Sequence, residues 1–173
     1  MVTRNSIDTS GSGIVQVVTS TLANDLDVTV TMPGISSATL PGYFLSSDVI
    51  PQQTDGTEIV TATITPLYAT SNLLIEYVGT ANYQGTYSWV SICSLFKDSG
   101  ANALATTCGT CGYYNQNIIR YLEASGSTTA RTYKIRVGPS LAGGSVSING
   151  TTPSYSIFPG INLSRINIYE VLV

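Results

Sequence analysis

The 173-residue chain contains no histidine, which removes the commonest general base and a frequent zinc ligand from the protein. Carboxylate pairs could still support glycoside hydrolysis, but the ten acidic residues fall mostly in predicted turns or on polar strand faces. None of them is marked as part of a facing pair, and no glycine-rich phosphate loop is present. The sequence therefore predicts a protein that is not an enzyme and that holds no metal and no other cofactor.

Charge is also scarce. Charged residues make up 10% of the chain, whereas roughly 25% is typical of a soluble domain. The net charge is −3, and the seven Lys and Arg residues form no long basic run, so we expect no nucleic-acid partner. No apolar run reaches the roughly 18 residues that a membrane-spanning helix needs. The N-terminal sequence has no apolar signal-peptide core, so we expect synthesis in a cytoplasm without export by the usual route.

Only three cysteines are present, and two of them, Cys108 and Cys111, form a C-x-x-C pair. A structural zinc site needs four ligands, and the third cysteine, Cys93, lies in a predicted strand. Small residues rather than a helix start surround the pair, which disfavours a redox motif. We therefore predict a tight loop in which the cysteines are compact side chains. A loop disulfide and a metal shared between subunits remain open alternatives.

What the sequence does have is alternation of apolar and polar residues with a period of two, which is typical of half-buried β-strands. Clusters of Gly, Pro, Ser and Asn separate roughly eight to ten such strands, and this pattern predicts a β-sandwich or jelly roll. No segment of helical length shows a period of 3.6. The clearest alternating segments are Leu26–Met32, Ile59–Pro66, Leu73–Val78, Arg131–Val137, Ser145–Ile148 and Leu163–Val173.

The segment Thr86–Phe96 differs because it is apolar at both odd and even positions. Tyr87, Trp89, Cys93 and Leu95 would share one face, while Val90, Ile92 and Phe96 would share the other. Such a strand is either covered on both sides within its own chain or covered on one side by a partner subunit.

The chain divides into an N-terminal arm at residues 1–13 and a single β-sandwich domain at residues 14–173. The arm is small and polar and would be disordered alone, so we expect a neighbouring subunit or a larger assembly to hold it. Arg4, Asn5 and Ile7 are therefore candidate partner-binding residues. Tyr113 and Tyr114 are a second candidate group, because tyrosine suits interfaces and sugar-binding surfaces.

Several segments carry a resemblance to a known family. They are "GSGIVQVV", "ATITPLYATSNLLIEY", "SICSLFKDSGANALA", "TTARTYKIRVG", "SVSING" and "SRINIYEV", in this order. Their order and spacing over residues 13–173 resemble the C-terminal head domains of tailed-bacteriophage virion proteins. The resemblance implies a homotrimeric jelly roll similar to the tumour-necrosis-factor and C1q heads. It also implies a role in tail fibres, receptor-binding tips or capsid decoration.

Because only about a dozen residues precede the predicted β region, we expect a small accessory protein rather than a long fibre. The first hypothesis is a capsid decoration, or cement, protein that binds the major capsid protein of the phage as a homotrimer. It would be part of the virion and assembled in the bacterial host cytoplasm. The alternative is a tail or fibre head that recognises host surface glycans through its tyrosine-rich loops. A carbohydrate-active enzyme is the third hypothesis.

Overall fold

The computed structural model describes residues 13–23, 26–29, 50–84, 90–110, 115–140, 145–152, 155–156 and 162–172. All regular secondary structure in these ranges is β-strand, and they contain no helix long and apolar enough to cross a membrane. The strands are β1 (Gly13–Leu22), β2 (Leu26–Val28), β3 (Thr57–Ile64), β4 (Asn72–Gln84), β5 (Val90–Lys97), β6 (Ala105–Thr110), β7 (Gln116–Ala124), β8 (Arg131–Pro139), β9 (Ser145–Ile148), β10 (Gly150–Thr152), β11 (Tyr155–Ser156) and β12 (Ser164–Leu172).

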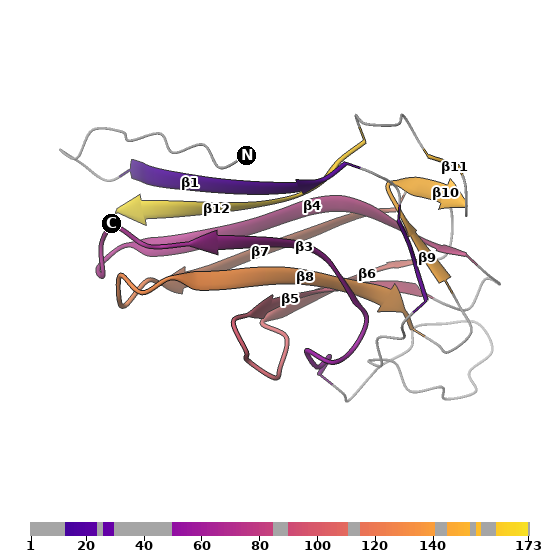
Figure 1. Cartoon of the computed structure of the whole chain (residues 1–173), viewed down its shortest axis with the longest axis horizontal. Coiled ribbons are helices and arrows are strands. Elements are labelled where there is room, and N and C mark those ends of the chain that lie inside the picture. The colour runs from indigo at the N-terminus through magenta and orange to yellow at the C-terminus, as the bar shows by residue number, and fades with distance from the viewer. Residues whose placement is uncertain are drawn as a thin grey trace.

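The strands form two antiparallel sheets. The six-stranded sheet has the order β1-β12-β4-β9-β2, with β7 also paired to β4, and the four-stranded sheet has the order β3-β8-β5-β6. The long strands of both sheets run in similar directions (Figure 1). A short β10–β11 hairpin lies beside them. The prediction of an all-β sandwich is therefore confirmed.

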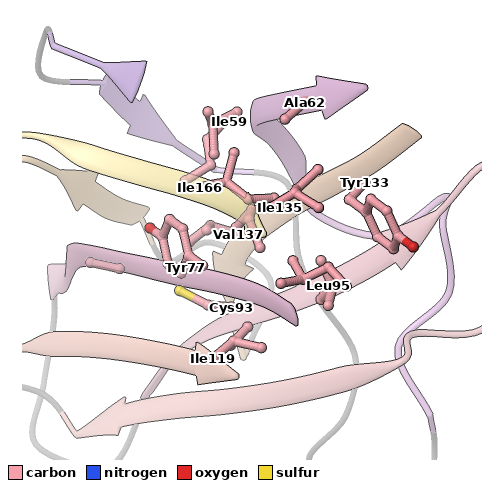
Figure 2. Close-up of a cluster of buried hydrophobic side chains, with 14 of the residues drawn as sticks. Ile59, Ala62, Tyr77, Cys93, Leu95, Ile119, Tyr133, Ile135, Val137 and Ile166 are labelled. Carbon is pink, nitrogen blue, oxygen red and sulfur yellow. The ribbon is translucent and has the colours of Figure 1, made fainter. Parts of the chain in front are cut away.

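The core lies between the two sheets and follows directly from the alternation in the sequence. Leu73, Ile75 and Tyr77 of β4 are fully buried, as alternation predicted. Side chains of the facing sheet pack against this set (Figure 2). Successive side chains of a strand point to opposite faces, so each inward row leaves an outward row behind it. The fully buried apolar side chains of β8 and β12 are Tyr133, Ile135, Val137, Ile166 and Ile168.

Strand β5 is covered on both faces, as one of the two sequence-based alternatives proposed. Cys93 and Leu95 join the core between the sheets, whereas Ile92 and Phe96 form a second, smaller cluster together with Val90 and Ala103. Phe96 is fully buried within this single chain. The other alternative, in which a partner subunit covers this face of β5, is therefore wrong, because Ile92 and Phe96 are already buried within the single chain.

A strap at residues 50–55 fastens the loop that carries Ala103. The amide of Gln53 donates to Ala101 O at 2.8 Å, and the amide of Ala103 donates to Pro51 O at 2.9 Å. The Gln52 side chain donates to Asn102 Oδ1 at 2.9 Å. The strap and the loop thus hold each other beside the outward face of β5.

Strands β6 and β7 are among the strands that the alternation in the sequence did not predict. Strand β6 contains Cys108, which was expected in a loop, and its backbone pairs with β5 opposite Ile92. Strand β7 pairs along its whole length with β4. The predicted strand Leu26–Met32 is confirmed at Leu26–Val28, and its last residues lie outside the described ranges. The proposed arm also lies outside them, apart from Gly13, at which β1 begins.

Candidate functional site

The partner-binding residues proposed from the sequence cannot be placed. Arg4, Asn5, Ile7, Tyr113 and Tyr114 all lie outside the described residues.

Of the C-x-x-C pair, Cys108 is an exposed free thiol on β6, and Cys111 lies outside the described ranges. The third cysteine, Cys93, is a buried free thiol, and burial followed by the neighbouring Cys108 raises its pKa well above the ordinary value. Among the residues that the structure places, no group of three or more His, Cys, Asp or Glu side chains could hold a metal ion.

Polar residues of the motifs that carry the resemblance form hydrogen bonds between segments that are distant in the sequence. Glu170 of β12 is fully buried, and its carboxylate accepts the Leu67 amide at 2.8 Å and 2.9 Å and the Tyr68 amide at 2.8 Å. It also accepts the Ser71 hydroxyl at 2.7 Å. With its amide turned to suit its neighbours, Gln16 donates to the same carboxylate at 3.0 Å. Motif residues from β1, β4's entry loop and β12 therefore meet at one buried carboxylate.

A second tie joins the Asn-Gly turn to the start of β12. Asn149 adopts a positive φ of 60° and donates from Nδ2 to Leu22 O at 2.9 Å. Ser164 donates to Asn149 Oδ1 at 2.8 Å. Gly79 lies close to Ser164, because a Cβ added to this glycine would lie 2.4 Å from Ser164 Oγ. This glycine is required by the close approach of the neighbouring side chains rather than by its backbone angles.

A third tie lies at the turn after β5, where Asp98 also has a positive φ, of 49°. Its carboxylate accepts the Thr132 amide at 2.8 Å, and its own amide donates to Thr132 O at 2.7 Å. Nearby, Glu123 of the six-stranded sheet pairs with Lys97 at 2.8 Å and accepts the hydroxyl of Tyr133. The Asp98 carboxylate thus holds the turn after β5 against β8, and the Glu123 carboxylate links the six-stranded sheet to the four-stranded sheet.

The surface that stands out instead is the outer face of the six-stranded sheet, formed by the outward side chains of β1, β12, β4 and β7. One row of directly opposed residues crosses all four strands and is apolar throughout: Leu122, Leu74, Tyr169 and Val17. Leu122 is 62% exposed. A row of apolar side chains on the outer face of a sheet, in a charge-poor protein, is a candidate interaction surface.

A second apolar pair extends this outer face. Ile118 of β7 lies opposite Val78 of β4, and Ile118 is 50% exposed. At the end where β1 begins, Ile14 lies opposite Val171 and is 40% exposed. Apolar side chains are therefore also found in outward rows nearer to both ends of the sheet.

The other sheet provides the comparison. The outward side chains of β3 and β8 include Thr61 and Thr63 on β3 and Thr132 and Lys134 on β8. The hydroxyls of Thr63 and Thr132 lie 2.8 Å apart and form a hydrogen bond. This outer face of β3 and β8 is thus polar, in contrast to the row of apolar side chains on the outer face of the six-stranded sheet.

Between the apolar rows lies one polar row, from Arg120 through Glu76 and Asn167 to Thr19. Arg120 donates to Glu76 Oε1 from Nε at 2.8 Å, and its Nη2 lies 2.7 Å from the same oxygen. Thr19 donates to Asn167 Oδ1 at 2.9 Å. The outer face therefore carries an ion pair at its centre.

Sequence reasoning missed this surface because it missed β7, which supplies Leu122, Ile118 and Arg120. The stretch "NIIRYLEA" is apolar at both odd and even positions, so it shows no clean alternation. The same two-sided pattern was recognised at Thr86–Phe96 and could have indicated β7 as well. Even so, the surface depends on strand register, which the sequence does not show.

No protein-family profile matches this chain, and no curated protein matches it. Among solved structures, it is similar to the enzymatically active domain of tailspike protein 4 of bacteriophage CBA120, at 16% sequence identity and a TM-score of 0.21. The match covers 90% of this chain and 19% of that chain, so this chain spans about a fifth of the solved chain's length.

This comparison corrects one prediction. The matching domain is described as enzymatically active, which contradicts the prediction that the chain is not an enzyme, and we withdraw that prediction. A TM-score of 0.21 is too low to assign an activity to this chain or to argue for a particular fold family.

Proposed function

We propose that this chain is a structural protein of a tailed-phage particle that assembles as a homotrimer and decorates the outside of the capsid. The observation that carries the proposal is the apolar outer face of the six-stranded sheet, which a second copy of the chain would cover. The phage assignment is supported by the sequence resemblance. Polar residues of the resembling segments are joined to each other by hydrogen bonds across the fold.

The order of pairing supports a jelly roll. Eight strands pair first with last (β1–β12), second with seventh (β3–β8), third with sixth (β4–β7) and fourth with fifth (β5–β6). One long antiparallel hairpin would give this order of pairs. Here the first and third pairs belong to the six-stranded sheet, and the second and fourth pairs belong to the four-stranded sheet. Jelly rolls of eight strands have this organisation, with two Greek keys.

Self-association is supported by the contrast between the two outer faces. The cores of permanent protein interfaces are depleted in charged residues and enriched in aromatic and apolar ones. The outer face of the six-stranded sheet fits this description, with Tyr169, Leu74 and Leu122 in one row. The outer face of β3 and β8, with its threonine hydroxyls, suits contact with water.

The substitution Leu122→Glu tests the self-association. Burial of an unpaired carboxylate costs several kcal/mol, so we expect the association to weaken at least about 100-fold and the variant to run as a monomer. Light scattering coupled to size-exclusion chromatography measures the mass. Thr63→Glu places the same charge on the other sheet and should leave the trimer intact.

Two results would contradict the proposed assembly: a monomeric wild-type protein at micromolar concentration, or a trimeric Leu122→Glu variant. Circular dichroism of both variants checks that the sandwich still folds.

The position on the particle is tested by electron microscopy of virions on which this protein is labelled. Capsid decoration predicts label spread evenly over the head. Label confined to the tail tip would replace this role by that of a receptor-binding head, and no label on any particle would contradict both.

A further inference from the structure

The starting point is the small number of charges on the outer face of the six-stranded sheet. Three of its described side chains are charged: Glu76 on β4, Arg120 on β7 and Arg165 on β12. Glu76 and Arg120 are directly opposed, and Arg165 lies opposite Val78 in the next outward row. All three thus lie on the face that we propose to be covered by another copy, with Leu74 and Val78 beside Glu76 on the same strand.

The ion pair uses only part of its hydrogen-bonding capacity. Both contacts of Arg120 go to the same oxygen, Glu76 Oε1. A carboxylate can accept about four hydrogen bonds and a guanidinium can donate five, so both groups keep hydrogen-bonding capacity beyond these two contacts. A guanidinium carries five N–H donors in a fixed fork that matches both oxygens of a carboxylate. The Arg120 side chain is 72% exposed, whereas that of Glu76 is 19% exposed, so the guanidinium extends outward from the sheet.

Covering this face would remove water from these two charged groups. A buried charge or polar group without a partner costs free energy, so an apolar partner surface would be unfavourable here. A partner that brings both a carboxylate and a guanidinium to the same place would satisfy both residues. A second copy of this chain carries this combination at the corresponding position.

We infer, on the basis of the proposed self-association, that Glu76 and Arg120 pair between copies as well as within one copy, and that this pairing selects which chains assemble together. In a ring of identical subunits every interface repeats the same contacts. The carboxylate of one copy therefore accepts from Arg120 of the next at each interface. Opposite charges brought together in this way favour correct partners, and like charges reject wrong ones.

The test exchanges the two charges. The double variant Glu76→Arg/Arg120→Glu keeps an ion pair within each chain and allows the same pairing between identical copies. Mixed with wild-type chains, however, it would bring like charges together at the interfaces. We expect two separate homotrimers after the two proteins are dissociated, mixed and reassembled, with mixed trimers at less than a tenth of their statistical share. Native mass spectrometry with one protein isotopically labelled measures these populations.

The control is Lys134→Glu, which changes a charge on the outer side of the four-stranded sheet and should mix freely with the wild type. Statistical mixing of the double variant with the wild type would overturn the inference and leave the proposed trimer standing. A wild-type protein that stays monomeric would instead contradict the proposed function itself.

If the exchanged chain does not assemble, the neutral double variant Glu76→Gln/Arg120→Gln decides the question. The inference expects its association to be at least tenfold weaker than that of the wild type. Unchanged association in sedimentation velocity experiments would overturn it, because a pair that acts only within one chain at an exposed surface contributes little.

Discussion

Glu170 shows how one side chain determines the local structure around it. Its carboxylate holds the backbone amides of Leu67 and Tyr68 and the hydroxyl of Ser71, all from the connection between β3 and β4. Ser125 donates to Tyr68 O at 2.6 Å and so extends the same network to the turn after β7. A buried carboxylate surrounded by donors is stable only while these donors remain in place.

The substitution Glu170→Gln should therefore be costly although it keeps the size of the side chain. The new side-chain amide would place its N–H donors against the backbone N–H groups that now donate to the carboxylate. We therefore expect a loss of about 2–3 kcal/mol in the free energy of unfolding. Urea denaturation followed by circular dichroism measures it. Glu58→Gln is the matched control, because Glu58 lies 3.9 Å from Arg136 at the surface and should change stability by less than about 0.5 kcal/mol. Equal effects for the two variants would contradict this role of Glu170.

At the scale of single strands, the sequence predicts those elements that have one apolar and one polar side. Strands β3 and β8 have the predicted alternation, and their inward residues Ala62, Ile64 and Ile135 are buried. Strand β7 was missed, because Ile118 and Leu122 face outward while Ile119 faces the core. An element that is apolar on both sides does not reveal by its pattern which side the chain itself covers.

Strand β5, which is apolar on both sides, allows a test of whether the chain itself covers its outward side. Phe96→Ala removes the largest side chain of its outer cluster, and we expect a loss of about 3–5 kcal/mol in unfolding free energy. The strap at residues 50–55 should loosen at the same time. Hydrogen exchange of the Gln53 and Ala103 amides, which bond to Ala101 O and Pro51 O, should become faster.

The matched variant is Phe96→Leu, which retains most of the apolar contact and should restore much of the protection. Unchanged exchange at Gln53 and Ala103 in Phe96→Ala would show that the strap does not depend on this cluster.

At the scale of the whole molecule, the outer face could not be predicted even from a perfect list of strands. Its residues come from β1, β4, β7 and β12, and they share a surface because of strand order and register. The pairing of β1 with β12 joins Gly13 to Leu172, from opposite ends of the described chain. Alternation specifies which side of each strand is apolar, but the neighbours of each strand are determined by packing of the two sheets.

The response of the whole molecule to alkaline pH follows from three buried groups that can lose a proton, the hydroxyls of Tyr77 and Tyr133 and the thiol of Cys93. Burial, and then the nearby Cys93, raises the pKa of Tyr77. Burial, and then the hydrogen bond from its hydroxyl to Glu123, raises the pKa of Tyr133. The pKa of the Cys93 thiol is also raised. The folded state holds these protons at pH values at which the unfolded chain releases them, so their stabilisation is fully present below the unfolded pKa values.

Stability should therefore fall as the pH rises above about 9 to 10, by about 1.4 kcal/mol per pH unit for each group that ionises only when unfolded. Between about pH 6 and 8 it should be nearly constant, because the chain has no histidine to titrate there. Urea denaturation across this range measures both parts of the curve. Constant stability up to pH 11 would contradict the assignment of these groups as buried acids.

The pairing of β1 with β12 also determines how the sandwich responds to mechanical tension. Gly13 and Leu172 lie opposite each other at the same end of neighbouring antiparallel strands. A force that separates these two residues acts across the strands, along the direction of their hydrogen bonds. It therefore loads the bonds one after another and peels β1 away from β12, beginning at that end. Tension along a strand would instead load the whole ladder at once, so the molecule is mechanically weak in one direction and strong in another.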